Sequence, residues 1–128
     1  MRRPVADTVQ RIEKPWGFEL WWARTDRYVG KILHVRKGES LSLQYHRVKE
    51  ETILVQSGRI LFETRPRDEK GELRKLEMKA GDVFHIVPGT VHRMTALEDC
   101  DIVEVSTPEL DDVVRIEDRY GRAGTSRP

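Results

Sequence analysis

Residues 38–58 decide the fold, and they read GESLSLQYHRVKEETILVQSG. Apolar and polar residues alternate in the first half, and a second apolar run follows a short polar break. This pattern is typical of two strands joined by a turn. Side chains two apart on a strand point to the same face, so Gln44 and His46 are expected to converge on one point. Glu51 opens the returning strand and can reach the same point.

A second cluster follows later in the chain and contains Gly81, Gly89 and His92. Imidazole, carboxylate and amide groups form a mixed nitrogen and oxygen set that suits a divalent transition metal and leaves positions open for water or substrate. The alternative is four polar side chains that face water at strand ends. We favour the metal, since burying such groups without a partner is costly. The sequence thus predicts one divalent ion per chain (Zn, Mn, Co, Ni or Fe), with the ligands Gln44, His46, Glu51 and His92.

Similar short segments continue on both sides of this stretch, separated by glycine, proline and other turn residues. Strands at such spacing favour an antiparallel sandwich or barrel, and no stretch has a convincing helical period. The expected fold class is therefore all-β. The expected strands are residues 16–22, 31–35, 41–46, 52–55, 59–64, 73–78, 83–87, 91–96 and 102–106, with an exposed loop at 67–72.

Length and composition exclude several classes of protein. A chain of 128 residues has the size of one domain, so we expect residues 1–128 to form a single domain. Its net charge of +1 provides no overall field that would attract nucleic acid or an anionic membrane. No apolar run reaches the roughly 18–20 residues of a membrane helix. The single cysteine, Cys100, excludes an intrachain disulfide and fits a cytoplasmic location.

The two clusters resemble the two motifs of the cupin superfamily, whose members are small double-stranded β-helix, or jelly-roll, barrels. The first motif is Gly-x5-His-x-His-x3–4-Glu-x6-Gly. Here Gln44 takes the place of the first histidine, and Glu51 rather than Glu50 keeps the spacing to the last glycine. The second motif is Gly-x5-Pro-x-Gly-x2-His-x3-Asn, in which Val87 replaces the proline and Ala96 the asparagine. The resemblance implies a jelly-roll barrel with the metal at the four predicted ligands.

The chain is similar in particular to the C-terminal cupin domain of type II mannose-6-phosphate isomerases, the bifunctional isomerase/mannose-1-phosphate guanylyltransferases. The sequence has no counterpart of their nucleotidyltransferase domain, so guanylyl transfer is not expected, and the chain looks most like the small stand-alone cupins related to these enzymes. Val48 and Thr52-Ile53 stand where that family usually has a second histidine and the end of a Glu-His-Trp run, which affects the expected substrate pocket. The similarity spans roughly residues 10–122, leaving a short flexible tail at 123–128, and is carried by residues 14–17, 42–46, 88–93 and 112–122.

Further residues are candidates for the pocket. Lys31 is in phase with the apolar residues of its strand, so it either points into the barrel, where it needs a partner or an anionic substrate, or protects a sheet edge. Arg115 and Arg122 lie in the part that resembles the isomerases, and guanidinium groups suit phosphate. His85 is a candidate to line the pocket and bind substrate; the alternative is a hydrogen-bonded structural histidine.

The function expected from this resemblance is a metal-dependent aldose–ketose isomerase that acts on a sugar or sugar phosphate through an enediolate. The sequence leaves Glu51 and Lys31 as candidates for the base that moves the proton. Two alternatives remain open: a carbohydrate-binding module without catalysis, and an iron-dependent dioxygenase. The aromatic residues of 16–22 also favour a homodimer, because one chain rarely leaves such a surface exposed.

Overall fold

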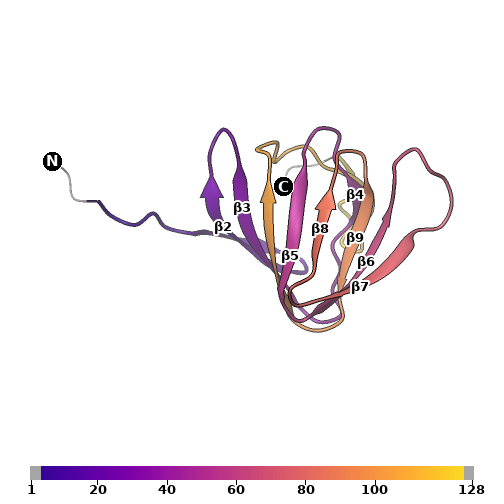
Figure 1. Ribbon diagram of the computed structural model, residues 1–128, viewed down its shortest axis with the longest axis horizontal. Coiled ribbons are helices and arrows are strands. Elements are labelled where there is room, and N and C mark those ends of the chain that lie inside the picture. Colours follow the sequence, from indigo (N-terminus) through magenta and orange to yellow (C-terminus); the bar gives the residue numbers. More distant parts are fainter. Residues whose placement is uncertain (1–3, 126–128) are drawn as a thin grey trace.

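The computed structural model describes residues 4–125, and these residues contain strands and turns but no helix. The all-β prediction is therefore confirmed (Figure 1). None of the described residues belongs to a helix that could span a membrane. The strands are β1 (Gln10–Lys14), β2 (Gly17–Arg24), β3 (Val29–Val35), β4 (Leu43–Tyr45), β5 (Glu51–Ser57), β6 (Arg59–Arg65), β7 (Arg74–Lys79), β8 (Val83–Ile86), β9 (Val91–Ala96), β10 (Cys100–Ser106), β11 (Val114–Glu117) and β12 (Gly124–Thr125).

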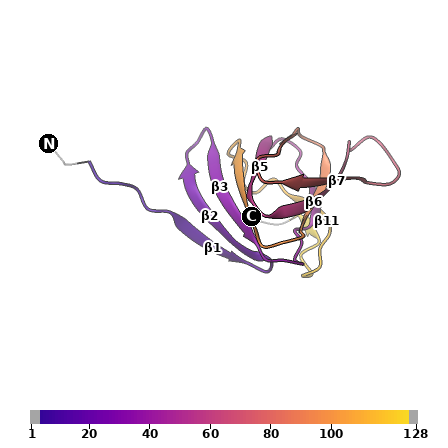
Figure 2. The ribbon, with the colours of Figure 1, turned by 60° about the horizontal axis from the view of Figure 1, so that its bottom comes forward.

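The strands form two antiparallel six-stranded sheets. In sheet A the order is β1-β2-β3-β10-β5-β8, and in sheet B it is β12-β11-β4-β9-β6-β7. Strands that follow each other in the sequence often lie in different sheets, so the chain crosses repeatedly between the two layers (Figures 1 and 2). This is the jelly-roll arrangement that the motif resemblance implied.

Most of the predicted strands are present, but their ends differ. The segment predicted as a strand over 41–46 is extended only over Leu43–Tyr45, and β1, β11 and β12 were not predicted. The tail predicted at 123–128 contains β12, and its last three residues lie outside the described residues.

The space between the sheets holds both apolar and charged side chains. The main apolar cluster is built around side chains with no exposed area, among them Ile53, Ile60 and Phe62. A smaller cluster contains Trp21, Val29 and Leu110. Inward-facing residues of sheet A also include charged groups, since Glu19, Lys31, Glu51 and Glu104 are each buried. Burial of so many charges in a chain this small marks the interior as the place to look for chemistry.

Gly58 shows why the first motif ends on a glycine. Its φ is 80°, a left-handed conformation that residues with a Cβ rarely adopt. A Cβ built at this position would also lie 2.4 Å from the backbone oxygen of Asp99 and 2.7 Å from the Cβ of Cys100. The turn between β5 and β6 therefore needs glycine for its backbone conformation and for its close approach to β10.

Candidate metal centre

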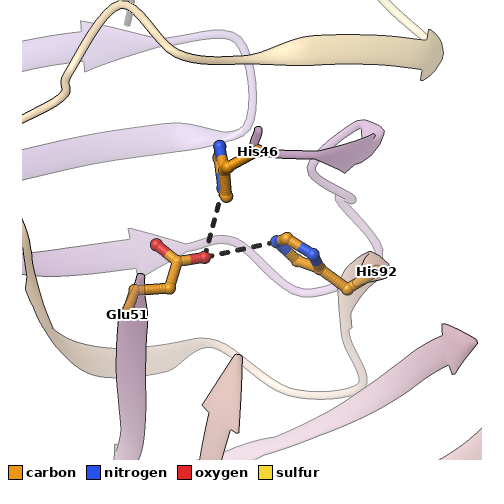
Figure 3. Close-up of side chains that lie close together, drawn as sticks. All are labelled: His46, Glu51 and His92. Carbon is orange, nitrogen blue, oxygen red and sulfur yellow. Dashed lines mark ion pairs between the residues drawn. The ribbon is translucent and has the colours of Figure 1, made fainter. Parts of the chain in front are cut away.

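The two sheets bring His46, Glu51 and His92 together inside the barrel (Figure 3). His46 directly follows β4 and His92 lies in β9, both from sheet B, whereas Glu51 opens β5 in sheet A. All three side chains are 3% exposed or less. Each offers one ligand atom, and these atoms lie within 4.8 Å of one another.

The spacing of the three ligand atoms suits a transition metal. Glu51 Oε1 lies 3.3 Å from His46 Nε2 and 3.3 Å from His92 Nε2. Two ligand atoms bound at about 2.0–2.1 Å in tetrahedral geometry are about 3.3 Å apart. The residues present therefore fit a divalent ion with only small movements of their side chains.

Backbone carbonyl groups orient both imidazole rings. His46 Nδ1 donates to the carbonyl oxygen of Asp112 at 2.5 Å, and His92 Nδ1 donates to that of Thr90 at 2.9 Å. A carbonyl oxygen can only accept, so each ring donates its Nδ1–H group and directs Nε2 toward Glu51. Metal-binding histidines are held in this way by a partner on the other ring nitrogen.

Lys49 connects the candidate ligands to a further carboxylate. Its Nζ lies 3.1 Å from Glu51 Oε2 and 3.4 Å from Glu104 Oε2, and its side chain is buried. Burial favours the neutral form of Glu51, but Lys49 and the two imidazoles outweigh it and hold the pKa of this carboxyl well below its usual range. Glu104 behaves oppositely: burial and the nearby charge of Glu51 raise its pKa, although Lys49 counteracts them.

Lys31 points into the barrel, as its phase with the apolar residues of its strand predicted. Its Nζ lies 3.2 Å from Glu19 Oε1 and 4.8 Å from the centre of the Trp21 ring. It does not protect a sheet edge, because β3 lies between β2 and β10. Glu19 also accepts a hydrogen bond of 2.7 Å from Trp21 Nε1. Although burial alone would raise the pKa of Glu19, Lys31 and Lys14 lower it, so the carboxylate stays charged.

The candidate ligands, Lys31 and Lys49 line one cavity between the sheets. Three further cationic side chains line it as well, namely Lys14, Arg115 and Arg122. Arg122 forms a two-pronged ion pair with Asp118, with N–O distances of 3.0 and 3.1 Å. Burial and the charge of Arg122 lower the pKa of Arg115. Burial lowers the pKa of Lys14, and the charges of both arginines add to the effect. An anion bound among these groups would relieve their repulsion.

Gln44, the fourth predicted ligand, lines the same cavity and is half-buried. It is the register partner of His92 on one side and of Arg115 on the other. These three inward-facing residues thus form one row across β11, β4 and β9, and the amide lies between the imidazole and the guanidinium group. The buried hydroxyl of Ser42, two residues earlier, also lines the cavity and has no hydrogen-bond partner among the described residues.

The model of the cupin domain family matches residues 31–106, which is more than half of the chain. The chain belongs to the cupin family. Over 123 residues this cupin is 34% identical to mannose-1-phosphate guanylyltransferase ManC of Salmonella typhimurium. Over 121 residues it is 33% identical to the mannose-1-phosphate guanylyltransferase of Escherichia coli (strain K12). Each match covers 88% of the cupin but 23% of the relative, so the chain spans about a quarter of the length of these curated relatives.

Solved structures show the same fold at lower sequence identity. KdgF from Halomonas sp. is similar with a TM-score of 0.64 and 22% identity, covering 82% of this cupin and 89% of that chain. The capsular polysaccharide assembling protein CapF from Staphylococcus aureus is similar with a TM-score of 0.67 and 20% identity, and the match covers 94% of this cupin and 32% of that chain. The oxalate decarboxylase of Lactobacillus farciminis is similar with a TM-score of 0.69 and 16% identity, and the match covers 84% of this cupin and 33% of that chain.

His85 lies apart from the other predicted site residues of the cupin. It is in β8, its side chain is 55% exposed, and its Nε2 contacts the carboxylate of Glu50. It does not line the cavity that contains Gln44, Lys31, the arginines and the candidate ligands. Its apolar neighbours in β8 point inward, so the alternation of the strand turns His85 outward. His85 therefore does not line the cavity, and its contact with Glu50 agrees with the alternative of a hydrogen-bonded histidine.

Several residues of the cavity were not predicted, namely Glu19, Lys49 and Glu104. Glu19 and Glu104 had a signal in the sequence, because each is in phase with buried residues of its strand, Trp21 and Ile102 respectively. Lys49 had none, since it lies in a connection. Its place is set by Asp112, whose carboxylate accepts hydrogen bonds from the backbone N–H groups of residues 47, 48 and 49.

Cys100 should be inert in the folded cupin. It is 1% exposed, and burial together with Asp101 raises the pKa of its thiol to about 11. The thiolate, which is the reactive form, is therefore scarce at ordinary pH. We expect iodoacetamide at pH 8 to leave the native protein unlabelled and to label it after unfolding in urea, as measured by mass spectrometry. Rapid labelling without urea would contradict the buried position.

Proposed function

We propose that this cupin is a metal-dependent isomerase that interconverts an aldose phosphate and a ketose phosphate, of the mannose-6-phosphate type. The observation that carries the proposal is that a possible set of metal ligands and a group of cationic side chains line one cavity. A metal ion at such ligands suits the oxygen atoms of a sugar, and the cationic side chains suit a phosphate group.

The charges in the cavity favour an anionic substrate. Five cationic side chains line it, Lys14, Lys31, Lys49, Arg115 and Arg122, against three anionic ones, Glu19, Glu51 and Glu104. The excess is two positive charges among the lining side chains when both imidazoles are neutral, and one when the Asp118 partner of Arg122 is included. A divalent ion would add two more. An enclosed site with such an excess attracts and retains anions.

The residues of the chain divide the work as follows. Arg115 and Arg122 bind the phosphate and fix the sugar in the cavity. Gln44, the register partner of Arg115 and of His92, adds a weaker ligand for the ion between the two ends of the site. A divalent ion held by His46, Glu51 and His92 would supply positive charge that stabilises an enediolate. A base in the cavity then moves a proton between C2 and C1.

The curated relatives support a phosphorylated hexose as substrate. Both are named as mannose-1-phosphate guanylyltransferases, and the match covers nearly all of this chain but only part of theirs. The part they share with the cupin contains the candidate ligands, so we take a hexose phosphate as the first substrate to test.

Exchange of the C2 proton with solvent tests the proposal directly. In deuterium oxide, with Mn(II), Co(II) or Zn(II) added, the protein should incorporate deuterium at C2 of mannose 6-phosphate, as measured by NMR. Exchange reports formation of the enediolate even when the net isomerisation is slow. The Arg115→Met variant should lose most of this exchange at low substrate concentration, because the phosphate loses a charge-assisted partner.

Each negative result points to another function. Absence of exchange with mannose, glucose and fructose phosphates under all three metals would contradict the isomerase. Tight sugar binding without exchange would indicate a carbohydrate-binding module. Oxygen consumption that requires Fe(II) would indicate a dioxygenase, for which two histidines and a carboxylate are a known ligand set.

We also propose that the cupin forms a homodimer through the outer face of sheet A. Trp16 and Trp21 are buried within the chain, so of the three tryptophans Trp22 remains, 48% exposed. The outer face nevertheless carries a continuous apolar row, because register pairs join Leu20, Ile32, Val103, Leu54 and Val83 across five strands.

The N-terminal segment supports a second copy as the partner. Residues 4–9 extend away from the barrel, and they carry the exposed side chains of Val5 and Val9 (Figure 1). A two-fold dimer would cover the segment and the sheet face of each copy at once, because both copies contribute the same surfaces. Sedimentation should therefore give a species of twice the chain mass at micromolar concentration. Leu54→Lys should convert it to a monomer with unchanged metal content, and a monomeric wild type would contradict the proposal.

A further inference from the structure

We propose that Glu104 is the general base of the cavity, the group that moves the proton between the two carbon atoms. The inference rests on the proposed isomerase function and deepens it. Sequence reasoning left Glu51 and Lys31 as candidates for the base. The contacts of the cavity-lining groups decide among them.

Glu51 has no oxygen left for a substrate. Its Oε1 faces the two imidazole nitrogens at 3.3 Å each, and its Oε2 accepts from Lys49 at 3.1 Å. A carboxylate that accepts a C–H proton needs an oxygen that can reach the carbon atom. Both imidazoles are excluded in the same way, since Nδ1 of each donates to a backbone carbonyl and Nε2 faces Glu51.

Lys31 and Glu19 engage each other. The ammonium group lies 3.2 Å from Glu19 Oε1, over the face of the Trp21 ring, and the same carboxylate oxygen accepts from Trp21 Nε1 at 2.7 Å. The nitrogen of Lys31 is therefore engaged by Glu19 and by the ring face and is not directed at a substrate. Lys49 is held in the same way by two carboxylates, and these partners raise its pKa although burial opposes them.

Glu104 and Glu19 each keep one oxygen available, but Glu19 is anchored by two donors, at 3.2 and 2.7 Å, whereas Glu104 has a single contact at 3.4 Å. It lies in β10, its side chain is 6% exposed, and it lines the same cavity as the candidate metal ligands. Its Oε2 accepts from Lys49 at 3.4 Å, whereas its Oε1 has no hydrogen bond or ion pair with any other described residue. Burial raises its pKa, which makes it a stronger base than an exposed carboxylate.

Lys49 also explains how the charged and the protonated forms of Glu104 can both be held. Its Nζ contacts Oε2 of Glu104 and Oε2 of Glu51, so it anchors the base next to a candidate metal ligand. When Glu104 takes up a proton, Lys49 still has the carboxylate of Glu51 as its partner. The charge of Lys49 therefore stays compensated during the proton transfer.

The step balances with the groups named. The free oxygen of Glu104 takes the proton from C2, and the electron pair of the broken C2–H bond forms the C1–C2 double bond. The electron pair of the carbonyl bond moves onto O1, which gives the enediolate. Glu104 then returns the proton to C1, the hydroxyl proton of O2 moves to O1, and a carbonyl forms at C2. No oxidant or additional reactant is needed.

Glu104→Gln tests this role, with Glu63→Gln as the matched control. Glu63 is also a buried glutamate with a cationic partner, Arg93, but it does not line the cavity. We expect Glu104→Gln to keep one Mn(II) per chain, measured by metal analysis, and to bind mannose 6-phosphate by calorimetry. Its exchange of the C2 proton should fall at least 100-fold, within the usual effect of removing a general base. Glu63→Gln should stay within threefold of wild type.

Formate rescue separates a base from a merely structural carboxylate. Glu104→Ala leaves room for a small carboxylate, so added formate should restore its exchange at least tenfold without changing its metal content. Exchange in Glu104→Gln within tenfold of wild type, or loss of Mn(II) from that variant, would overturn the inference, as would an Ala variant that formate does not rescue. Absence of exchange in the wild type would overturn the isomerase proposal itself, and the role of Glu104 with it.

Discussion

Replacement of His92 by alanine should remove most of the divalent metal that the purified protein retains after dialysis. His46→Ala should have the same effect. Each imidazole contributes one of three closely spaced ligand atoms, and its loss leaves Glu51 and a single nitrogen. Gln44→Ala should lower the metal content less, because a neutral amide oxygen is a weaker ligand for these metals than an imidazole nitrogen. Elemental analysis of the dialysed proteins, expressed as metal per chain, measures all three effects.

His85→Ala is the matched control for this experiment. It removes the same side chain from an exposed position on β8, outside the cavity. It should therefore leave the metal content unchanged. Wild-type metal content in both His46→Ala and His92→Ala would show that the candidate centre does not bind the ion.

Gly58→Ala should cause a large loss of stability. A left-handed backbone costs a residue with a Cβ about 1–2 kcal/mol. Steric overlap in a packed region adds about 1–3 kcal/mol, and at Gly58 the new Cβ would overlap the backbone of Asp99 and the side chain of Cys100. The free energy of unfolding, measured in urea, should therefore fall by about 2–5 kcal/mol.

Gly38→Ala isolates the backbone contribution. Gly38 has nearly the same φ, 84°, but a Cβ built there would have no atom within 4 Å. The free energy of unfolding of Gly38→Ala should fall by about 1–2 kcal/mol, which is the cost of the left-handed conformation alone. Equal losses at the two positions would show that the close approach to β10 is relieved without cost.

The sequence was most informative where strand alternation decides the direction of a side chain. Gln44 and His46, two residues apart, line the same cavity, as the strand period required. Lys31 is buried with the apolar residues that share its phase. The same rule could have removed His85 from the site, because its neighbours in β8 point inward.

Other features depend on contacts between distant segments, which no local pattern contains. Lys49 owes its position to Asp112, whose carboxylate and carbonyl oxygens hold the connection after β4. The pairing of β11 with β4 likewise arises from tertiary packing, since the two strands are about 70 residues apart in the sequence. The availability of Glu104 could be recognised only after the partners of every other carboxylate in the cavity were known.

The origin of the candidate ligands in both sheets has a consequence for folding kinetics. His46 and His92 come from sheet B and Glu51 comes from sheet A, so the complete set exists only after the two layers have docked. An ion held there would stabilise the native state, and it would not stabilise a transition state in which the two layers are still apart. It would therefore slow unfolding while leaving the rate of folding nearly unchanged. The lifetime of the folded chain, and its resistance to proteases, would then follow the supply of metal in its surroundings.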